Sequence, residues 1–230
     1  MKTTGIYLHC DPTMSHYLKV VMDCIFGEDL FRNEIVWWYE KWTDTSRFFQ
    51  RNHDIVLFYA NGPAAKTFTK LYGSLTDRQV ALMKTGYNLG SSGGKDIVRV
   101  YDRSKIPQST INGWKAANRA IYDVPTPKGK AMLPSVWPIP VLNSQAKERT
   151  GYPTQKPHAL LHRVVSASSN KNDMILDPFC GCATICIAAE ELQCQWIGID
   201  IGEKATELAQ MRMREHLGML YDGNHRTDIP

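Results

Sequence analysis

Short runs of apolar residues and amphipathic stretches alternate along the first part of the chain. The runs 5–10, 33–39 and 54–59 are typical of β-strands. Residues 14–26 place apolar side chains three and four positions apart, which predicts a helix that ends at Gly27. We expect the strands 33–39 and 54–59 to form an antiparallel pair at the edge of a sheet.

The C-terminal part follows the order strand, loop, helix, strand. Residues 174–177 form a short apolar run typical of a buried parallel strand, and residues 184–192 have the composition of a helix. Residues 195–200 predict a second strand, which ends in an acid. Further helices are expected from Pro157 onward and after Asp200. This alternation predicts an α/β fold.

Between residues 62 and 140 the regular periodicity fades. Lysine and arginine residues are scattered through this segment with aromatic residues among them, and Gly90–Gly94 predicts a flexible loop tip. A long irregular insertion in a compact enzyme is usually a binding segment or a disordered one. Basic side chains mixed with aromatic ones suit contacts with the phosphates and bases of a nucleic acid. The alternative is a solvated insertion with ordinary surface charge.

Length and composition limit the remaining possibilities. The 230 residues, 43% of them hydrophobic, predict a single domain, 1–230, with an insertion at 62–140. No apolar run is long enough to span a membrane and no signal peptide is found, so we expect a cytoplasmic protein. The six cysteines lie mostly in apolar patterns typical of reduced packing residues. No metal site is expected, and a net charge of +4 permits a polyanionic partner without requiring one.

The loop that follows the strand 174–177 carries the candidate chemistry. Gly181 allows a tight turn before the helix, and Asp200 lies 19 residues further on. In nucleotide-type cofactor sites, backbone N–H groups at a helix start face an anion and a distal carboxylate accepts from a ribose hydroxyl. A single glycine suits a dinucleotide poorly, whereas S-adenosylmethionine offers a carboxylate and a ribose diol. The alternative is an ordinary strand–turn–helix without a ligand.

A second element strengthens the cofactor interpretation. The sequence Thr-Gln-Lys-Pro at 154–157, a helix, and then Asp-Pro-Phe-x-Gly at 177–181 resembles the amino DNA methyltransferases, which methylate adenine N6 or cytosine N4. Both motifs lie near the C-terminus, which resembles the permuted β-group arrangement of that family. The resemblance extends from Gly5 to about Arg214. It implies a Rossmann-like methyltransferase fold, a mixed sheet with helices on both faces, with a cofactor-binding half at 151–215.

The resemblance also implies S-adenosylmethionine as cofactor, double-stranded DNA as partner and target recognition within the inserted segment. Lys156 could pair with the cofactor carboxylate or with a nearby acid, and Phe179 could pack on the adenosine or fill the core. Ala183 stands where the family usually has glycine. The cofactor-binding residues implied are Thr154, Lys156, Pro157, Asp177, Phe179, Gly181 and Asp200.

Residues 52–54, Asn-His-Asp, resemble the family segment that shapes the pocket for the extruded base. His53 could contact that base, although a hydrogen bond to a loop carbonyl is the favoured alternative. His9 and His16 are expected to be structural or surface residues.

The family's catalytic loop, an Asp, Asn or Ser followed by Pro-Pro and an aromatic residue, has no counterpart because the chain contains no Pro-Pro pair. In the permuted arrangement this loop precedes the strand matching 5–10. We therefore expect that the chain is incomplete at its N-terminus, and we assign no catalytic residue within it. The strands 5–10 and 174–177 would then be separated by a gap of about 9–10 Å, or re-paired, with unpaired edges.

Three functions remain open on the sequence. The first is a site-specific DNA methyltransferase. The second is a non-catalytic, cofactor- and DNA-binding half of a split methyltransferase, completed by a missing N-terminal polypeptide or acting as a homodimer. The third is a Rossmann-type methyltransferase that acts on RNA or small molecules.

Overall fold

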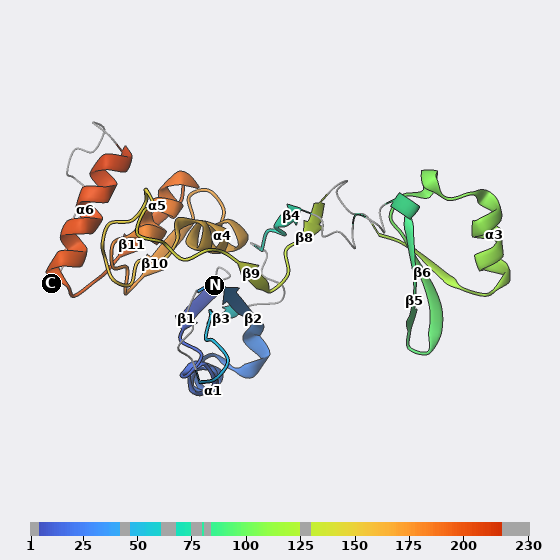
Figure 1. Cartoon of the computed structure of the whole chain (residues 1–230), viewed down its shortest axis with the longest axis horizontal. Helices are drawn as coiled ribbons and strands as arrows, with labels where there is room; N and C mark the ends of the chain where they lie inside the picture. Colours follow the sequence, from blue (N-terminus) through green and yellow to red (C-terminus); the bar gives the residue numbers. More distant parts are fainter. Residues whose placement is uncertain are drawn as a thin grey trace. The chain divides into compact units, whose positions relative to one another are not determined.

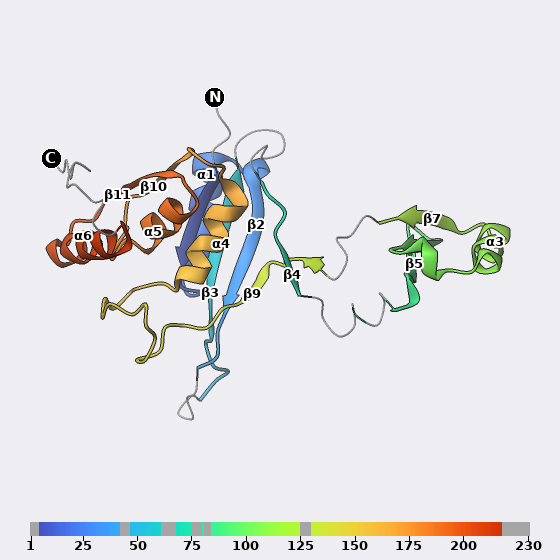
Figure 2. The same cartoon turned by 90° about the horizontal axis from the view of Figure 1, so that it is seen from above.

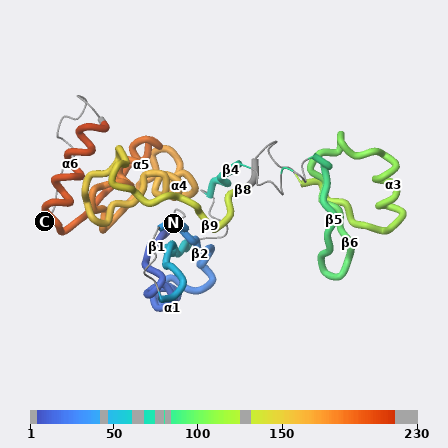
Figure 3. Tube along the Cα trace, viewed as in Figure 1, coloured from blue at the N-terminus to red at the C-terminus, as the bar shows by residue number. Residues whose placement is uncertain are grey.

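The computed structural model describes residues 5–41, 47–60, 68–74, 80, 84–124 and 130–217. The chain divides into two compact units (Figure 1). Residues 1–69 and 134–230 form the core unit, and residues 70–133 form the inserted unit. Figure 3 traces the chain, which leaves the core unit after the third strand and returns to it before the ninth.

The larger sheet of the core unit has four strands in the order β1–β3–β2–β9. Strand β3 (His53–Ala60) runs antiparallel to both β1 (Gly5–Cys10) and β2 (Phe31–Trp38), and β9 (Val136–Pro138) pairs parallel to β2. The predicted antiparallel pair is therefore confirmed, but its predicted place at the edge is wrong. The pair lies inside the sheet because β1 flanks one side and the short β9 flanks the other.

Helices cover both faces of this sheet, as predicted. Figure 1 shows α1 (Ser15–Phe26) and α4 (His158–Ser168) on opposite sides of it, and Figure 2 shows α4 running over β1, β3 and β2. Successive side chains of a strand point to opposite faces of the sheet. Because helices cover both faces, β3 is buried over most of its length. Leu57 and Tyr59 pack toward α1, and Val56 and Phe58 pack toward α4. This double burial makes β3 a continuous apolar run.

The turn after α1 follows from backbone sterics. Gly27 has φ +90°, a left-handed conformation that favours glycine, and it ends the helix as predicted. A short 3₁₀ turn, η1 (Glu28–Leu30), then leads into β2.

The C-terminal part contains the predicted strand–loop–helix–strand order. Strands β10 (Met174–Asp177) and β11 (Gln195–Gly198) pair in parallel, and α5 (Thr184–Glu191) connects them. Helix α5 packs Ala188 and Ala189 against Ile175 and Trp196, with Val165 of α4 in the same cluster. Helix α6 (Glu203–Leu217) follows.

The described strands of the core unit form two sheets rather than one complete sheet. Strand β1 pairs only with β3, and β10 pairs only with β11, within the described residues. Helix α4 contributes to both, because Leu160 and Val164 pack on the larger sheet while Val165 packs on α5. Among the described residues, therefore, β1 has one unpaired edge in the larger sheet, and β10 has one in the β10–β11 sheet.

The inserted unit has a core of its own. The hairpin β5 (Tyr87–Ser92) and β6 (Lys95–Val100) is antiparallel, and β7 (Ala120–Asp123) pairs parallel to β6. The turn η2 (Arg103–Lys105) leads to α3 (Gln108–Ala116), which packs Ile111 and Trp114 against this sheet. Strands β4 (Tyr72–Ser74) and β8 (Lys130–Met132) form a separate antiparallel pair.

This unit corrects two predictions. In its described residues the segment forms strands and a helix where the sequence predicted irregular structure, and residues 70–133 form a compact unit within the predicted insertion at 62–140. Residues 90–92 belong to β5, so only Gly93 and Gly94, with φ +57° and +74°, form the turn. A glycine- and serine-rich strand pairs through its backbone, and for this reason its side-chain pattern gave no strand signal.

The predicted frayed tail, 221–230, lies outside the described residues. None of the helices in the described part of the chain has the length and apolar character needed to cross a membrane.

Candidate functional site

The loop between β10 and α5 is built on two left-handed residues. Gly181 has φ +52° and Ala183 has φ +58°, with α5 beginning at Thr184. A Cβ added at Gly181 would lie 2.9 Å from the ring of Tyr152. Glycine is thus required at 181 for its conformation and for the close approach of Tyr152, a neighbour that the sequence did not indicate. The positive φ at Ala183 is a conformation that favours glycine, which is the residue that the family resemblance led us to expect there.

Asp200, two residues after β11, is hydrogen-bonded to this loop. One carboxylate oxygen accepts from the backbone N–H of Gly181 at 2.9 Å, and the other accepts from the N–H of Gly202 at 2.9 Å. The structure therefore brings the predicted residues Gly181 and Asp200 together. Each carboxylate oxygen has a second lone pair, so the same side chain can still accept from a ribose hydroxyl.

Asp177 closes the other side of the loop. Its carboxylate accepts from the backbone N–H of Phe179 at 3.0 Å. Burial raises the pKa of Asp177, and the negative charge of Asp200 raises it further, against the lowering effects of the Phe179 N–H and of Lys156. The pair of acids concentrates negative charge beside the loop.

Phe179 resolves one of the alternatives left by the sequence. Its side chain is 84% exposed, so it does not fill the core. An exposed aromatic ring beside a glycine turn offers a flat apolar surface to a ligand.

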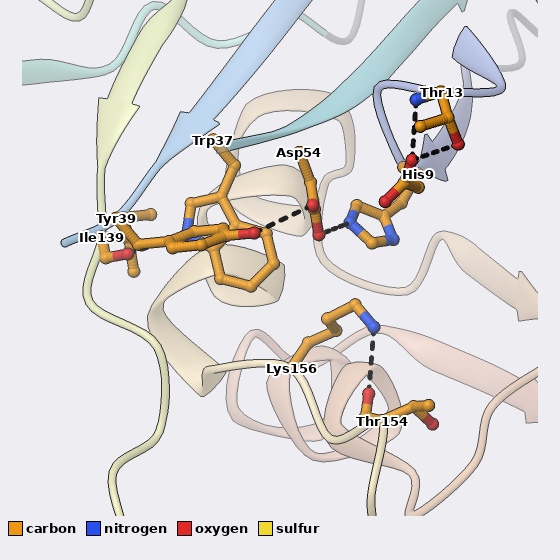
Figure 4. A network of polar contacts seen from close by, with 9 residues as sticks. His9, Thr13, Trp37, Tyr39, Asp54, Ile139, Thr154 and Lys156 are labelled. Carbon is orange, nitrogen blue, oxygen red and sulfur yellow. Dashed lines mark hydrogen bonds and ion pairs between the residues drawn. The ribbon is translucent and has the colours of Figure 1, made fainter. Parts of the chain in front are cut away.

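The Thr154–Pro157 element lies before α4. Pro157 is buried and precedes the first helical residue, while Thr154 is exposed. The Lys156 ammonium donates to the carbonyl of Thr154 at 3.0 Å, and Figure 4 shows its side chain extending toward Asp54 and His9. Burial lowers the pKa of Lys156, and the charges of Asp54 and Asp177 oppose that change. Lys156 forms no ion pair with any residue that the structure describes.

A polar network that the sequence did not predict faces Lys156 (Figure 4). Asp54 pairs with Nε2 of His9 at 2.9 Å and accepts from the hydroxyl of Tyr39 at 3.0 Å. Burial alone would raise the pKa of Asp54, but the bonds from His9 and Tyr39 and the charge of Lys156 lower it overall. Burial and the Asp54 charge raise the pKa of Tyr39 to about 12, which keeps its hydroxyl protonated as a donor.

The strand order places this network where ligands bind in α/β sheets. Strands β1 and β2 are both antiparallel to β3, so their carboxyl ends meet at the start of β3. His9 and Asp54 lie at that end, within reach of Lys156 and hence of the β10 loop. Clefts at the carboxyl ends of strands are the usual ligand sites of open α/β sheets. His9, predicted to be structural or at the surface, is hydrogen-bonded to Asp54 within this network, which agrees with a structural role.

Metal-ligating chemistry has no cluster to support it in the described ranges. No group of three or more His, Cys, Asp or Glu side chains there could hold a metal ion.

Similar proteins of known activity include DNA methyltransferases. The chain is 28% identical over 211 residues to the type II methyltransferase M.HpaI of Haemophilus parainfluenzae, covering 90% of this chain and 52% of that protein. It is 30% identical over 145 residues to the DNA adenine methyltransferase YhdJ of Escherichia coli, covering 63% and 46%. The chain thus spans about half the length of the curated relatives it matches.

Solved structures share the fold. The M1.HpyAVI complex with SAM superposes with a TM-score of 0.56 at 18% identity, covering 93% of this chain and 76% of that one. The PvuII cytosine-N4-specific DNA methyltransferase gives 0.52 at 11% identity, covering 90% and 63%. These identities support the fold alone.

The model of the N6/N4 family described as "DNA methylase" matches residues 1–211. The match includes the inserted unit, the Thr154–Pro157 element and the β10–α5 loop. Because it covers most of the sequence, the chain belongs to this DNA methylase family.

Proposed function

We propose that this protein transfers a methyl group from S-adenosylmethionine to the exocyclic amine of adenine (N6) or cytosine (N4) in DNA. The observation that carries the proposal is the β10–α5 loop, which Asp200 holds at the N-terminus of a buried helix. Family membership supports the reaction class. When bound, the cofactor supplies an electrophilic methyl on a sulfonium.

The chain's own residues divide the work of binding. The amides at the start of α5 and the Lys156 ammonium face the amino-acid carboxylate of the cofactor. Asp200 accepts from a ribose hydroxyl, and the exposed ring of Phe179 covers the adenine. Thr154 and Pro157 fix the turn from which Lys156 extends.

Calorimetric titration with S-adenosylmethionine tests the cofactor site. We expect Asp200→Ala to weaken binding at least about tenfold, because it removes a ribose acceptor and releases the loop. The control is Glu207→Ala, an exposed acid on the nearby helix α6, which should leave affinity unchanged. Equal affinities for the wild type and Asp200→Ala would contradict the assignment.

For the DNA partner, we propose the inserted unit as the binding surface. Residues 70–133 contain eleven lysines and arginines but only four acids, a net charge of +7, while the whole chain carries +4. The remainder is therefore negative, so the excess of positive charge belongs to this unit. Within its described part, Arg103 pairs with Asp123 and Arg119 with Asp96.

Three other cations of the unit are available for phosphates. Lys95, Arg99 and Lys115 form no ion pair with the described residues. Phosphate contacts from such side chains position a protein on DNA. The hairpin turn at Gly93–Gly94, next to Lys95, is small and exposed, which suits entry into a groove.

We further propose that a polypeptide segment outside these 230 residues completes the site. Strands β1 and β10 each have an unpaired edge among the described residues. One face of the β10–β11 sheet exposes the apolar side chains of Met174, Leu176 and Ile197 at 53%, 59% and 47%. Parallel sheets are ordinarily covered on both faces. A strand added between β1 and β10, with a covering layer, would satisfy these edges and bring further residues to the site.

Transfer of labelled methyl groups to unmodified bacterial DNA tests the reaction and its completeness together. Cofactor binding without transfer by the chain alone supports the requirement for a completing segment, and the chain's sedimentation as a monomer would exclude a homodimer. Transfer by the chain alone would show that the described site is sufficient. Absence of cofactor binding would overturn the methyltransferase proposal itself.

A further inference from the structure

A buried positive charge lies behind the cofactor loop. Arg212 of α6 is only 8% exposed, and it is the one charged side chain that is buried in the described part of the chain. Buried charges in proteins are almost always paired, because transfer of an ion out of water is costly. The position of this residue therefore needs a physical reason.

The guanidinium of Arg212 is bound to the loop rather than to an acid. Its Nη1 donates to the carbonyl of Cys182 at 2.6 Å and to the hydroxyl of Thr184 at 2.9 Å, and lies 3.4 Å from Sγ of Cys182. No acidic side chain of the described residues forms an ion pair with it. Among the described residues, therefore, no carboxylate compensates this positive charge.

These contacts hold the strained part of the loop. Cys182 and Thr184 flank Ala183, whose φ of +58° is unfavourable for a residue with a Cβ. The bond to the carbonyl of Cys182 holds the peptide group between Cys182 and Ala183, and the bond to the side-chain hydroxyl of Thr184 ties Arg212 to the first residue of α5. Arg212 thus orients the first amides of α5 and adds positive potential behind them.

We propose that Arg212 is a positioning residue that makes the β10–α5 loop selective for ligands that carry a carboxylate. The guanidinium, which no described carboxylate compensates, lies behind the loop, and the carboxylate at the amino-acid end of the cofactor would compensate its charge from the other side. Arg212 acts through the loop amides and does not contact the cofactor. This inference rests on the proposed cofactor site and adds a determinant of its anion preference.

The test compares two ligands that share adenosine and differ in the amino-acid end: S-adenosylhomocysteine and 5′-methylthioadenosine. Calorimetry on the full chain should show that Arg212→Met weakens S-adenosylhomocysteine binding about tenfold or more, with less than about a twofold change for 5′-methylthioadenosine. Arg212→Lys keeps the charge and should retain part of the preference. The matched control, Arg214→Met, changes an exposed arginine of the same helix and should alter neither affinity.

The outcomes separate the proposals. Equal weakening of both ligands by Arg212→Met would mean that Arg212 only supports the fold of the loop, and no change in either would mean that it plays no part in binding. Both results overturn the inference. A wild-type chain that binds neither ligand would instead remove the cofactor site on which the inference rests.

Discussion

Single residues decide whether the β10–α5 loop can form. Gly181 combines a left-handed backbone with a ring 2.9 Å from the place of a Cβ, while Gly27 is left-handed with no atom within 4 Å of that place. Comparison of the two glycines thus distinguishes the cost of a left-handed backbone, which both share, from the cost of steric overlap, which applies only at Gly181. Similarly, the carboxylate of Asp54 is hydrogen-bonded to His9 of β1 and to Tyr39, which follows β2, so the pKa of Asp54 depends on both neighbours.

Gly181→Ala should lower the free energy of unfolding by about 2–4 kcal/mol, since it adds backbone strain and a clash with Tyr152. Gly27→Ala, the control, should cost about 1–2 kcal/mol because it adds strain alone. Urea denaturation measures both. If the two substitutions cost the same, the close approach of Tyr152 has no energetic weight.

Tyr39→Phe should lower the free energy of unfolding by about 1 kcal/mol at pH 7, because the ionised Asp54 loses a donor. The folded pKa of Asp54 lies below its ordinary value, so this stabilisation is present above the unfolded value of about 3.9 and is lost as pH falls through the lowered pKa. The difference between the variants should therefore narrow toward pH 3 in urea titrations. Tyr17→Phe, at an exposed tyrosine of the same unit, should show no such trend.

At the scale of elements, the described residues cover only one face of the β10–β11 sheet. Ile175 packs against α5, whereas Leu176, the next residue of the same strand, is 59% exposed. Neighbouring positions in one strand thus report on the two faces of the sheet.

Ile175→Asp should lower the free energy of unfolding of the isolated chain by at least about 3 kcal/mol, because it buries an unpaired carboxylate. Leu176→Asp should change it by less than about 1 kcal/mol. Thermal unfolding of both variants checks the contrast. A large loss at position 176 would mean that this face is already covered and would remove the support for a completing segment.

At the scale of the whole molecule, charge is divided between the two units. The positive excess lies in residues 70–133, while the remainder of the chain is negative. Such a division separates a surface suited to a polyanion from a site with clustered acids.

The triple substitution Lys95→Gln, Arg99→Gln and Lys115→Gln should reduce the slope of log K against log salt by about two to three for duplex DNA. Each lost phosphate contact removes about 0.9 of slope. Arg103→Gln, which breaks an ion pair with Asp123, serves as the control and should change the slope by less than about one. Fluorescence anisotropy over a salt series measures both. An unchanged slope in the triple variant would exclude these side chains as the DNA contacts.

The sequence alone predicted the elements that depend on local patterns. The apolar runs of β1, β3 and β10, the amphipathic α1 and its end at Gly27, and the loop at Gly181 were all readable because their signals lie within a few adjacent residues. The motifs at 154–157 and 177–181 also indicated the family, which the family model confirms.

Tertiary structure decided the rest, because partners distant in sequence leave no local trace. His9 and Asp54 meet only through the register of β1 with β3, and Arg212 reaches Cys182 only because α6 packs beside the loop. The exposure of Phe179 and the regular fold of residues 84–124 likewise depend on what packs nearby. Local pattern thus determined which elements form and which motif they carry, and long-range packing determined which side chains hold that motif in place.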